Sequence, residues 1–310
     1  MKVMNSYKIG LIGFNELQSR VLHEVLQNPR FELVAATDIP VEFRKALPRE
    51  VKIYSSVEEM LSSTMLNVVS ICHEPDKKLS YANIVADRGI NIIYEPPIHD
   101  DLEKVEGVLE KLRNNKVFAM PLDEVFFHKV IQQLIQSVMD NAIGLPIVAY
   151  CRRFDRRRIK PKKLLYLTMP FITLSRRLMN SEPTEVYASI KEEEIGLINI
   201  NFENKTSAVI CFGHRTLESY PVDDITIDVI GTDGVLTAKP DNASIRIYSE
   251  KSFSKENWEE KGISSLFKHL ISRLQGGGAI LDIEDDLVAV RVLAAATESN
   301  SRKDCVKIRS

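Results

Sequence analysis

Cysteine is scarce in this sequence of 310 residues, and its four cysteines lie far apart, without a CxxC pair or a histidine at zinc-ligand spacing. We therefore expect free thiols in a reducing compartment and no metal site. No apolar run approaches the roughly 20 residues that a membrane helix requires. The opening residues contain glycine and no small-residue cleavage site, which indicates a first strand rather than a leader. These absences predict a soluble, cytoplasmic protein with no membrane partner.

An excess of charge of either sign is also missing. Lys and Arg number 41 and Asp and Glu 43, which gives a net charge of −2. This balance argues against a nucleic-acid partner, because proteins that bind nucleic acid along a broad surface are strongly basic. The length and the hydrophobic fraction of 44% are those of a globular protein with two domains.

The apolar patterns change character near residue 122. Up to that point, short buried strands alternate with amphipathic helices, which predicts a doubly wound parallel sheet. Beyond it, a series of strands is interrupted by one helix pattern, Leu164–Met179, and two helices close the chain. The polar stretch SEKSFSKENWEEK before Gly262 predicts solvated turns. We therefore predict an α/β domain of the Rossmann type followed by an α+β domain with a largely antiparallel sheet.

The turn after the first predicted strand carries an incomplete dinucleotide fingerprint. The fingerprint places glycine at its first, third and sixth positions, so that a pyrophosphate can approach the backbone and a helix N-terminus. Here the turn reads GFNELQ: Gly13 and Phe14 begin it, whereas Asn15 and Gln18 replace the later glycines and Glu16 adds a negative charge. The turn predicts either a site for NAD or NADP, or an ordinary tight turn in which dinucleotide binding has been lost.

Asp38 ends the second predicted strand, Phe31–Thr37. An acidic residue at this place accepts the hydroxyls of the adenosine ribose and repels a 2′-phosphate, so Asp38 favours NAD over NADP. The alternative is that Asp38 only caps the short helix that follows Pro40.

Several stretches of the sequence, in this order, resemble the Gfo/Idh/MocA family of NAD(P)-dependent oxidoreductases, which act mostly on sugars and polyols. They are YKIGLIGF with NPRFELVAATD, NIIYEPP, ITIDVIGTDGVL, and AAATES near the C-terminus. The resemblance implies a Rossmann domain over residues 1–122, with a C-terminal helix of about 280–310 packing back on it, and a substrate domain over 123–280. The exposed sheet face of such a second domain often forms the interface of a homo-oligomer.

The resemblance also implies which groups should transfer protons, and this sequence departs from the family at each of them. The family uses the lysine of a Glu-Lys-Pro motif, and an aspartate and a histidine from a glycine-rich helix start. Here the motif reads Glu95-Pro96-Pro97, and the helix start places Tyr166 and Pro170 at the other two positions. A proline side chain cannot exchange a proton, and oxidation of an alcohol by hydride transfer requires a base.

Two functions follow from this departure. One is a catalytically impaired relative that acts as a ligand-binding or regulatory protein. The other is an active NAD(P)H-dependent reductase with a rebuilt pocket, in which Tyr166, Tyr94 or His128 donates a proton. The structural alternative for Tyr166 is an aromatic core residue of the helix at Leu164–Met179, and His128 is interpreted first as structural.

Two further loops follow predicted strands and are expected to border the nicotinamide. His73 follows the strand Asn67–Cys72, and Glu95 and Pro96 follow the strand Asn91–Tyr94. The ends of parallel strands share one edge of the sheet, so these residues join Gly13 and Asp38 as predicted cofactor contacts. A hydrogen-bonded loop histidine is the alternative for His73.

The segment CRRFDRRRIKPKK, residues 151–163, holds eight basic residues and one acid. Arginine side chains suit carboxylates and phosphates, so the segment predicts an anionic small-molecule ligand or an acidic partner. The alternative is a solvated loop whose charges pair with acids elsewhere in the protein. The residues assigned to the anion are Arg152, Arg156, Arg157, Arg158 and Lys163.

Overall fold

The computed structural model describes residues 6–155, 159–191, 195–214, 224–249, 253–257 and 262–308. Contacts divide the chain into two compact units: Met1–Asp123 with Leu266–Leu287, and Glu124–Ser265 with Val288–Ser310. The predicted boundary was 122/123, with about 280–310 assigned to the first domain; in the structure, Val288–Ser310 groups with the second unit. Among the described residues, no helix is long and apolar enough to cross a membrane.

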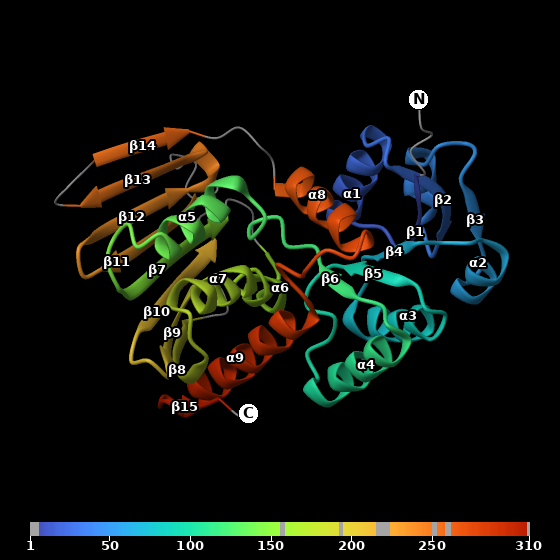
Figure 1. Cartoon of the computed structure of the whole chain (residues 1–310). Coiled ribbons are helices and arrows are strands. Elements are labelled where there is room, and N and C mark those ends of the chain that lie inside the picture. The colour runs from blue at the N-terminus through green and yellow to red at the C-terminus, as the bar shows by residue number, and fades with distance from the viewer. Residues whose placement is uncertain are drawn as a thin grey trace. The chain divides into compact units, whose positions relative to one another are not determined.

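Unit 1 is built on a parallel sheet of six strands in the order β3-β2-β1-β4-β5-β6 (Figure 1). The strands are β1 (Tyr7–Ile12), β2 (Phe31–Thr37), β3 (Lys52–Tyr54), β4 (Val68–Ile71), β5 (Asn91–Tyr94) and β6 (Ala119–Pro121). The helices are α1 (Glu16–Gln27), η1 (Val41–Ala46), α2 (Val57–Ser63), α3 (Pro75–Asp87), α4 (Leu102–Asn115), most of α8 (Gly262–Leu274) and the start of α9 (Ile283–Arg302). The predicted doubly wound fold is confirmed.

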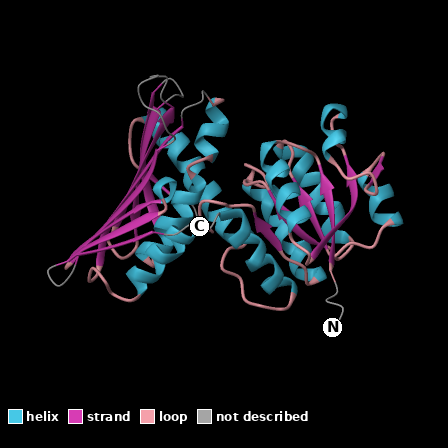
Figure 2. Cartoon of the chain, turned by 90° about the horizontal axis from the view of Figure 1, so that it is seen from above, coloured by secondary structure: helices cyan, strands magenta, loops and turns pink. Residues whose placement is uncertain are grey.

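Helices cover both faces of this sheet, as Figure 2 shows. All four residues of β4 are buried, and the last four of β1 are buried as well. A parallel strand covered on both sides reads as a continuous apolar run, which explains why these strands were recognisable from sequence. The order of the strands reverses between β1 and β4, and ligands of such sheets bind outside the carboxyl ends of the strands at that point.

Unit 2 contains a sheet of nine strands in the order β14-β13-β12-β11-β7-β10-β9-β8-β15. The pairing of β10 with β7 is parallel and the other pairs are antiparallel, which confirms the predicted open, largely antiparallel sheet. The strands are β7 (Pro146–Asp155), β8 (Pro183–Lys191), β9 (Ile195–Phe202), β10 (Ser207–His214), β11 (Asp224–Gly231), β12 (Gly234–Lys239), β13 (Ser244–Ser249), β14 (Phe253–Asn257) and β15 (Val306–Lys307). Its other elements are α5 (Lys129–Met139), α6 (Pro161–Tyr166), α7 (Met169–Met179), η2 (Pro240–Asn242) and the remainder of α9.

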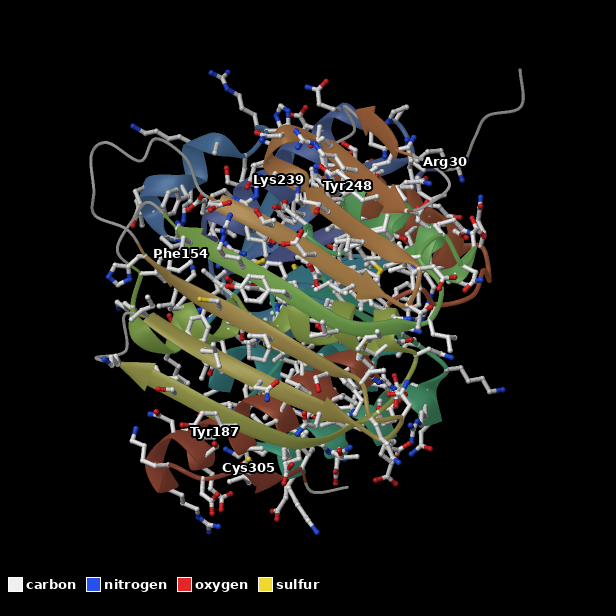
Figure 3. All side chains as sticks on the ribbon, turned by 90° about the vertical axis from the view of Figure 1, so that its left-hand side faces the viewer. Arg30, Phe154, Tyr187, Lys239, Tyr248 and Cys305 are labelled. Atoms are coloured by element: carbon white, nitrogen blue, oxygen red, sulfur yellow. The ribbon has the colours of Figure 1, made fainter. Side chains whose placement is uncertain are left out.

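Helices α5 and α7 pack on one face of this sheet, and no described helix covers the other, open face (Figures 2 and 3). Successive side chains of strand β7 point alternately to the covered and the open face. Ala149 and Cys151 are fully buried, whereas Tyr150 between them is 36% exposed. The Cys151 thiol lies 3.9 Å from the hydroxyl of Ser175 in α7, so the buried row faces the helices. Tyr150 therefore belongs to the open face.

Two local predictions for unit 2 were wrong. The single helix predicted over Leu164–Met179 is two helices, α6 and α7, with the second beginning just before Pro170. Proline lacks an N–H group and its ring collides with the preceding helical turn, so it starts a helix instead of continuing one. Residues 253–257 form strand β14, where the sequence predicted solvated turns.

Candidate functional site

The residues predicted to contact a cofactor in unit 1 lie together at the carboxyl edge of its sheet. Asp38 follows β2, Gly13 and Asn15 follow β1, His73 follows β4, and Glu95 follows β5. These four strands are neighbours in the sheet. The structure therefore places these loops at one edge of the sheet, where side-chain hydrogen bonds join several of them.

Gly13 makes the tight turn between β1 and α1. Its φ of +74° belongs to the left-handed region, and a Cβ atom added there would lie 2.2 Å from the carbonyl oxygen of Cys72. Only glycine can combine this conformation with such a close approach of the loop after β4. Gly13 thus fixes the distance between the loops after β1 and β4.

Three polar groups from the loop after β4 and from α3 surround the Asp38 carboxylate. The Tyr81 hydroxyl donates to it at 2.7 Å and the Lys77 ammonium at 3.3 Å, and His73 Nε2 lies 3.1 Å away. The Tyr81 hydrogen bond, aided by Lys77, lowers the pKa of Asp38, whereas burial and Asp38 raise the pKa of Tyr81 to about 12. All three contacts reach Oδ2; none of the described residues donates to Oδ1, and the side chain is 35% exposed.

His73 completes this cluster as a neutral ring. Its Nδ1 accepts the backbone N–H of Glu74 at 2.7 Å, so the proton of the neutral ring is on Nε2, which faces Asp38. Burial lowers the pKa of His73, although the charge of Asp38 opposes this shift. Because its pKa is lowered, the His73 ring is uncharged at neutral pH, and its 3.1 Å contact with Asp38 is a polar contact and not an ion pair.

Asn15 caps helix α1 and bridges it to the loop after β5. Its side-chain oxygen accepts the backbone N–H of Gln18 at 3.0 Å, and its amide donates to Glu95 Oε2 at 2.7 Å. This second bond crosses the end of β4, which lies between β1 and β5 in the sheet. Among the described residues, no acceptor contacts the backbone N–H of Phe14, Asn15 or Leu17.

Gln18, which replaces the last glycine of the fingerprint, is completely buried. Its amide donates to the Ser70 carbonyl at 3.2 Å and accepts the Ser70 hydroxyl at 2.6 Å. The Gln18 side chain thus joins helix α1 to β4 by hydrogen bonds. A glycine at this position would only let the helix pack closely on the strand.

Sequence reasoning missed Lys77, Lys78 and Tyr81 of helix α3. Lys77 and Tyr81 are four residues apart, so they share one helix face, and this spacing in PDKKLSYA could have placed both beside the end of β2. Lys78 is only 2% exposed, and its ammonium donates to the backbone carbonyl of Glu95 at 2.6 Å. Pro96, at the family's lysine position, is half-buried and precedes a cis peptide bond to Pro97.

The other predicted residues belong to unit 2. Tyr166 ends α6 and is half-buried, with the Lys162 ammonium 5.8 Å from its ring centre. His128 caps α5 by accepting the N–H of Val130, as its structural interpretation requires. Within β7, Arg152 bonds Asp224 at 3.0 Å and Arg153 pairs with Asp155.

Two features of the basic segment bear on its predicted ligand. Arg152 and Arg153 already have carboxylate partners inside unit 2, and Lys163 is exposed on α6. Arg156, Arg157 and Arg158 lie outside the described residues.

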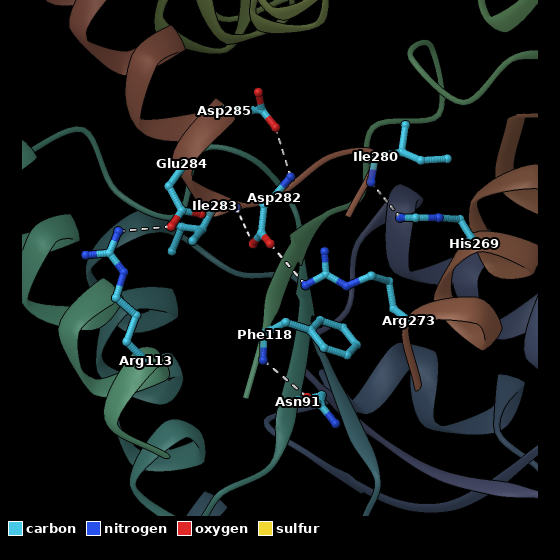
Figure 4. A network of polar contacts seen from close by, with 10 residues as sticks. All are labelled: Asn91, Arg113, Phe118, His269, Arg273, Ile280, Asp282, Ile283, Glu284 and Asp285. Atoms are coloured by element: carbon cyan, nitrogen blue, oxygen red, sulfur yellow. Dashed lines mark hydrogen bonds and ion pairs between the residues drawn. The ribbon is translucent and has the colours of Figure 1, made fainter. Parts of the chain in front are cut away.

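A second polar network in unit 1 connects α8 to α9 and is structural (Figure 4). Asp282 accepts the N–H of Ile283 at 2.8 Å and bonds Arg273 at 3.0 Å, and Asp285 accepts the N–H of Asp282 at 3.0 Å. The Arg273 guanidinium covers the ring of Phe118 at 4.6 Å. These contacts cap α9 and attach it to the sheet beside β6.

Comparison with known proteins agrees with this geometry. Residues 7–121 match the model of the oxidoreductase family with an NAD-binding Rossmann fold, GFO_IDH_MocA. None of the curated proteins matches the sequence.

Many solved structures share the fold of the whole chain. An oxidoreductase from Agrobacterium radiobacter in complex with NAD+, L-tartaric acid and magnesium has a TM-score of 0.87 at 15% identity, covering 98% of this chain and 99% of its own. Scyllo-inositol dehydrogenase from Lactobacillus casei, with NAD(H) and scyllo-inositol, has a TM-score of 0.83 at 17% identity, covering 99% and 100%. GenD2 from gentamicin A biosynthesis, in complex with NAD, has a TM-score of 0.85 at 15% identity, covering 100% and 98%. The predicted resemblance is confirmed: residues 7–121 match the NAD-binding Rossmann domain of the Gfo/Idh/MocA oxidoreductases, and the chain has the fold of the three solved proteins throughout.

Proposed function

We propose that this protein binds NAD(H) at the carboxyl edge of the first sheet, lacks the family's proton-transfer groups, and acts as a ligand-binding or regulatory relative of the dehydrogenases. The observation that carries this proposal is a pair of features on neighbouring loops. Asp38 is an ionised carboxylate with Oδ1 available to hydroxyls, and Pro96 stands where hydride chemistry on an alcohol needs a base.

The described residues fit the adenosine half of NAD. Asp38 would accept the ribose hydroxyls through Oδ1 and repel the 2′-phosphate of NADP. Phe14 stacks on Phe43 with ring centres 5.0 Å apart, and Phe43 is 40% exposed, which supplies an apolar surface beside Asp38 for the adenine. NAD is therefore the favoured dinucleotide, and NADP is the alternative.

The pyrophosphate turn fits less completely. The N–H groups of Phe14, Asn15 and Leu17 could bind a phosphate at the N-terminus of α1. The N–H of Gln18, however, is already bonded to Asn15, and the exposed Glu16 adds negative charge beside these groups. We therefore infer that this turn binds the pyrophosphate weakly, and that most of the affinity for NAD(H) comes from the contacts at Asp38.

When bound, NAD(H) would accept or supply a hydride. The residues at the family's three proton-transfer positions are Pro96, Tyr166 and Pro170, and only Tyr166 has an exchangeable proton. A phenol ordinarily stays protonated at neutral pH, so Tyr166 suits donation to a reduced substrate better than abstraction from an alcohol. This supports the alternative function, an active NAD(P)H-dependent reductase with a rebuilt pocket and Tyr166 as the catalytic residue.

The ligand of unit 2 is proposed to be a small anion. Tartrate, present in the structure of the Agrobacterium radiobacter protein, is a hydroxylated dicarboxylate, and arginine forks recognise carboxylates in pairs. The proposed contacts are Arg156, Arg157, Arg158 and Lys163, on the ground of their positive charge, whereas Arg152 of the predicted set bonds Asp224.

Calorimetric titration with NADH and NADPH tests the proposed function. We expect NADH to bind in the micromolar range and NADPH at least about tenfold more weakly, because the phosphate meets the Asp38 carboxylate. Consumption of NADH with a carbonyl-bearing carboxylate, abolished in Tyr166→Phe, would instead support the reductase. Absence of binding by either dinucleotide would contradict the proposal.

We also propose that the open face of the second sheet forms a homo-oligomer in a reducing, cytoplasmic setting. The face carries Tyr150, Tyr187 and Tyr248, each at least 36% exposed, on β7, β8 and β13. Figure 3 labels Tyr187 and Tyr248 on this face. Apolar and aromatic side chains exposed on one face are typical of an interface.

Tyr150→Glu is expected to dissociate this oligomer into monomers, because the interface would bury an unpaired charge at its centre. Sedimentation velocity measures the change in mass. Met139→Glu is the matched control: Met139 is 73% exposed at the end of α5, on the helix-covered side of the same sheet, and the oligomer should survive its replacement. A wild type that is monomeric at all concentrations would contradict the proposal.

A further inference from the structure

Two buried charged side chains lie on either side of the Glu95-Pro96-Pro97 turn. Lys78 comes from α3 and is 2% exposed; Asp286 comes from the start of α9 and is 3% exposed. Removing a charge from water costs several kcal/mol per ion unless partners compensate it. Hydrogen-bond partners must therefore compensate the lost hydration of both side chains.

Each of the two charges holds one end of the turn. Lys78 donates to the Glu95 carbonyl at 2.6 Å, and Asp286 Oδ2 accepts the Ile98 N–H at 2.9 Å and the Tyr94 hydroxyl at 3.0 Å. Pro96 and Pro97 between these points have no N–H group. The two prolines can donate no backbone hydrogen bond, so the donors and acceptors at the two ends of the turn hold it, together with the bond from the Glu95 N–H to the Ile71 carbonyl.

Lys78 has donor protons and Asp286 has an acceptor oxygen that the bonds to the turn do not use. Of the described residues, only Glu95 accepts a hydrogen bond from the Lys78 ammonium, which has three protons to donate. Oδ1 of Asp286 is buried without a partner. The two charges also interact electrostatically. Burial lowers the pKa of Lys78, and the negative charge of Asp286 opposes this shift. Burial raises the pKa of Asp286, and the positive charge of Lys78 opposes that shift.

We propose that Lys78 and Asp286 act as one coupled pair of positioning residues that fixes the position of the Glu95–Ile98 turn. This turn then positions the Glu95 carboxylate, which accepts a hydrogen bond from Asn15 at the sheet edge proposed to bind the dinucleotide. This inference rests on the proposed binding of NAD(H). Neither residue is catalytic, because both are buried beneath the turn. Their effect on the dinucleotide passes through the backbone at Glu95 and Ile98.

Dissociation constants for NADH in a double-mutant cycle test the coupling. Lys78→Gln keeps a donor for the Glu95 carbonyl but removes the charge, and Asp286→Asn keeps an acceptor for Ile98. We expect each single variant to weaken NADH binding about tenfold, and the double variant to weaken it no further, because the charges act as a pair. Purely multiplicative effects, or single variants within twofold of wild type, would overturn the proposal.

Asp282→Asn is the matched control. Asp282 is a partly buried aspartate immediately before α9, and it pairs with Arg273 and not with the turn. Its replacement should change stability while leaving the NADH dissociation constant within about twofold.

A second measurement needs no nucleotide and separates failure of this inference from failure of the proposed function. Carbon-13 NMR can follow the titration of the Asp286 carboxyl. Burial raises its pKa to about 6, and the charge of Asp285 adds to this rise, whereas the hydrogen bonds from Ile98 and Tyr94 and the charge of Lys78 oppose it. Loss of the positive charge in Lys78→Gln should raise this pKa further. An unchanged titration would refute the pair; a shifted titration in a protein that does not bind NADH would refute only the proposed function.

Discussion

Replacing Gly13 with alanine is expected to lower the free energy of unfolding by about 3 kcal/mol. About 1–2 kcal/mol of this comes from a side chain in the left-handed region, and the rest from the collision of the new Cβ with the Cys72 carbonyl. The carbonyl is backbone, so it can yield only if the loop after β4 moves away from β1. Denaturant unfolding of the purified variant measures the loss.

Gly89→Ala separates the two contributions. Gly89 follows the C-cap of α3 with a φ of +68°, yet a Cβ atom there would meet nothing within 4 Å. Its replacement should cost about 1–2 kcal/mol, from the conformation alone. Equal losses in the two variants would show that the loops after β1 and β4 are not in the close contact described.

Replacing Asp38 with asparagine is expected to reverse the preference between the dinucleotides. A hydrogen bond to a charged group contributes about 1.5–3 kcal/mol, so NADH binding should weaken tenfold or more. NADPH binding should strengthen, because the carboxylate that repels the 2′-phosphate is gone while the Lys77 ammonium stays nearby. Fluorescence titration with both reduced dinucleotides gives the two dissociation constants.

Asp87→Asn is the control for loss of one negative charge from unit 1. Asp87 ends α3 and forms a surface ion pair with Lys111 at 2.9 Å, and such pairs contribute little. Both dinucleotides should bind this variant as they bind the wild type. If Asp38→Asn changes NADH and NADPH binding by the same factor, Asp38 does not recognise the ribose.

The fold was readable from the sequence where periodicity and burial coincide. Strands such as β4 are apolar throughout because both of their faces are covered, and the glycine turn after β1 marks the start of the first crossover. The break between α6 and α7 was missed because the apolar spacing continues across it, although Pro170 was visible. Strand β14 was missed because its polar, charged residues carry no apolar alternation.

The candidate site was predictable only as a set of loops. Strand ends identified Gly13, Asp38, His73 and Glu95, because parallel strands place their carboxyl ends on one edge. The hydrogen bonds that join Asp38 to Tyr81 and Asn15 to Glu95 span 43 and 80 residues of sequence, and no local pattern encodes such contacts. The buried position of Lys78 was equally hidden, since a lysine in a sequence is expected at the surface.

The most direct test combines NAD+ and a panel of inositols, sugars and hydroxy acids with the purified protein, and follows NADH formation over many turnovers. Our account predicts that reduced dinucleotide added to the same sample binds, whereas no polyol or hydroxy acid yields NADH above the protein-free rate. Steady, stoichiometric NADH formation from any of them would mean that a base sits beside the nicotinamide, and that the proline at position 96 has been replaced in function by a group that we have not assigned.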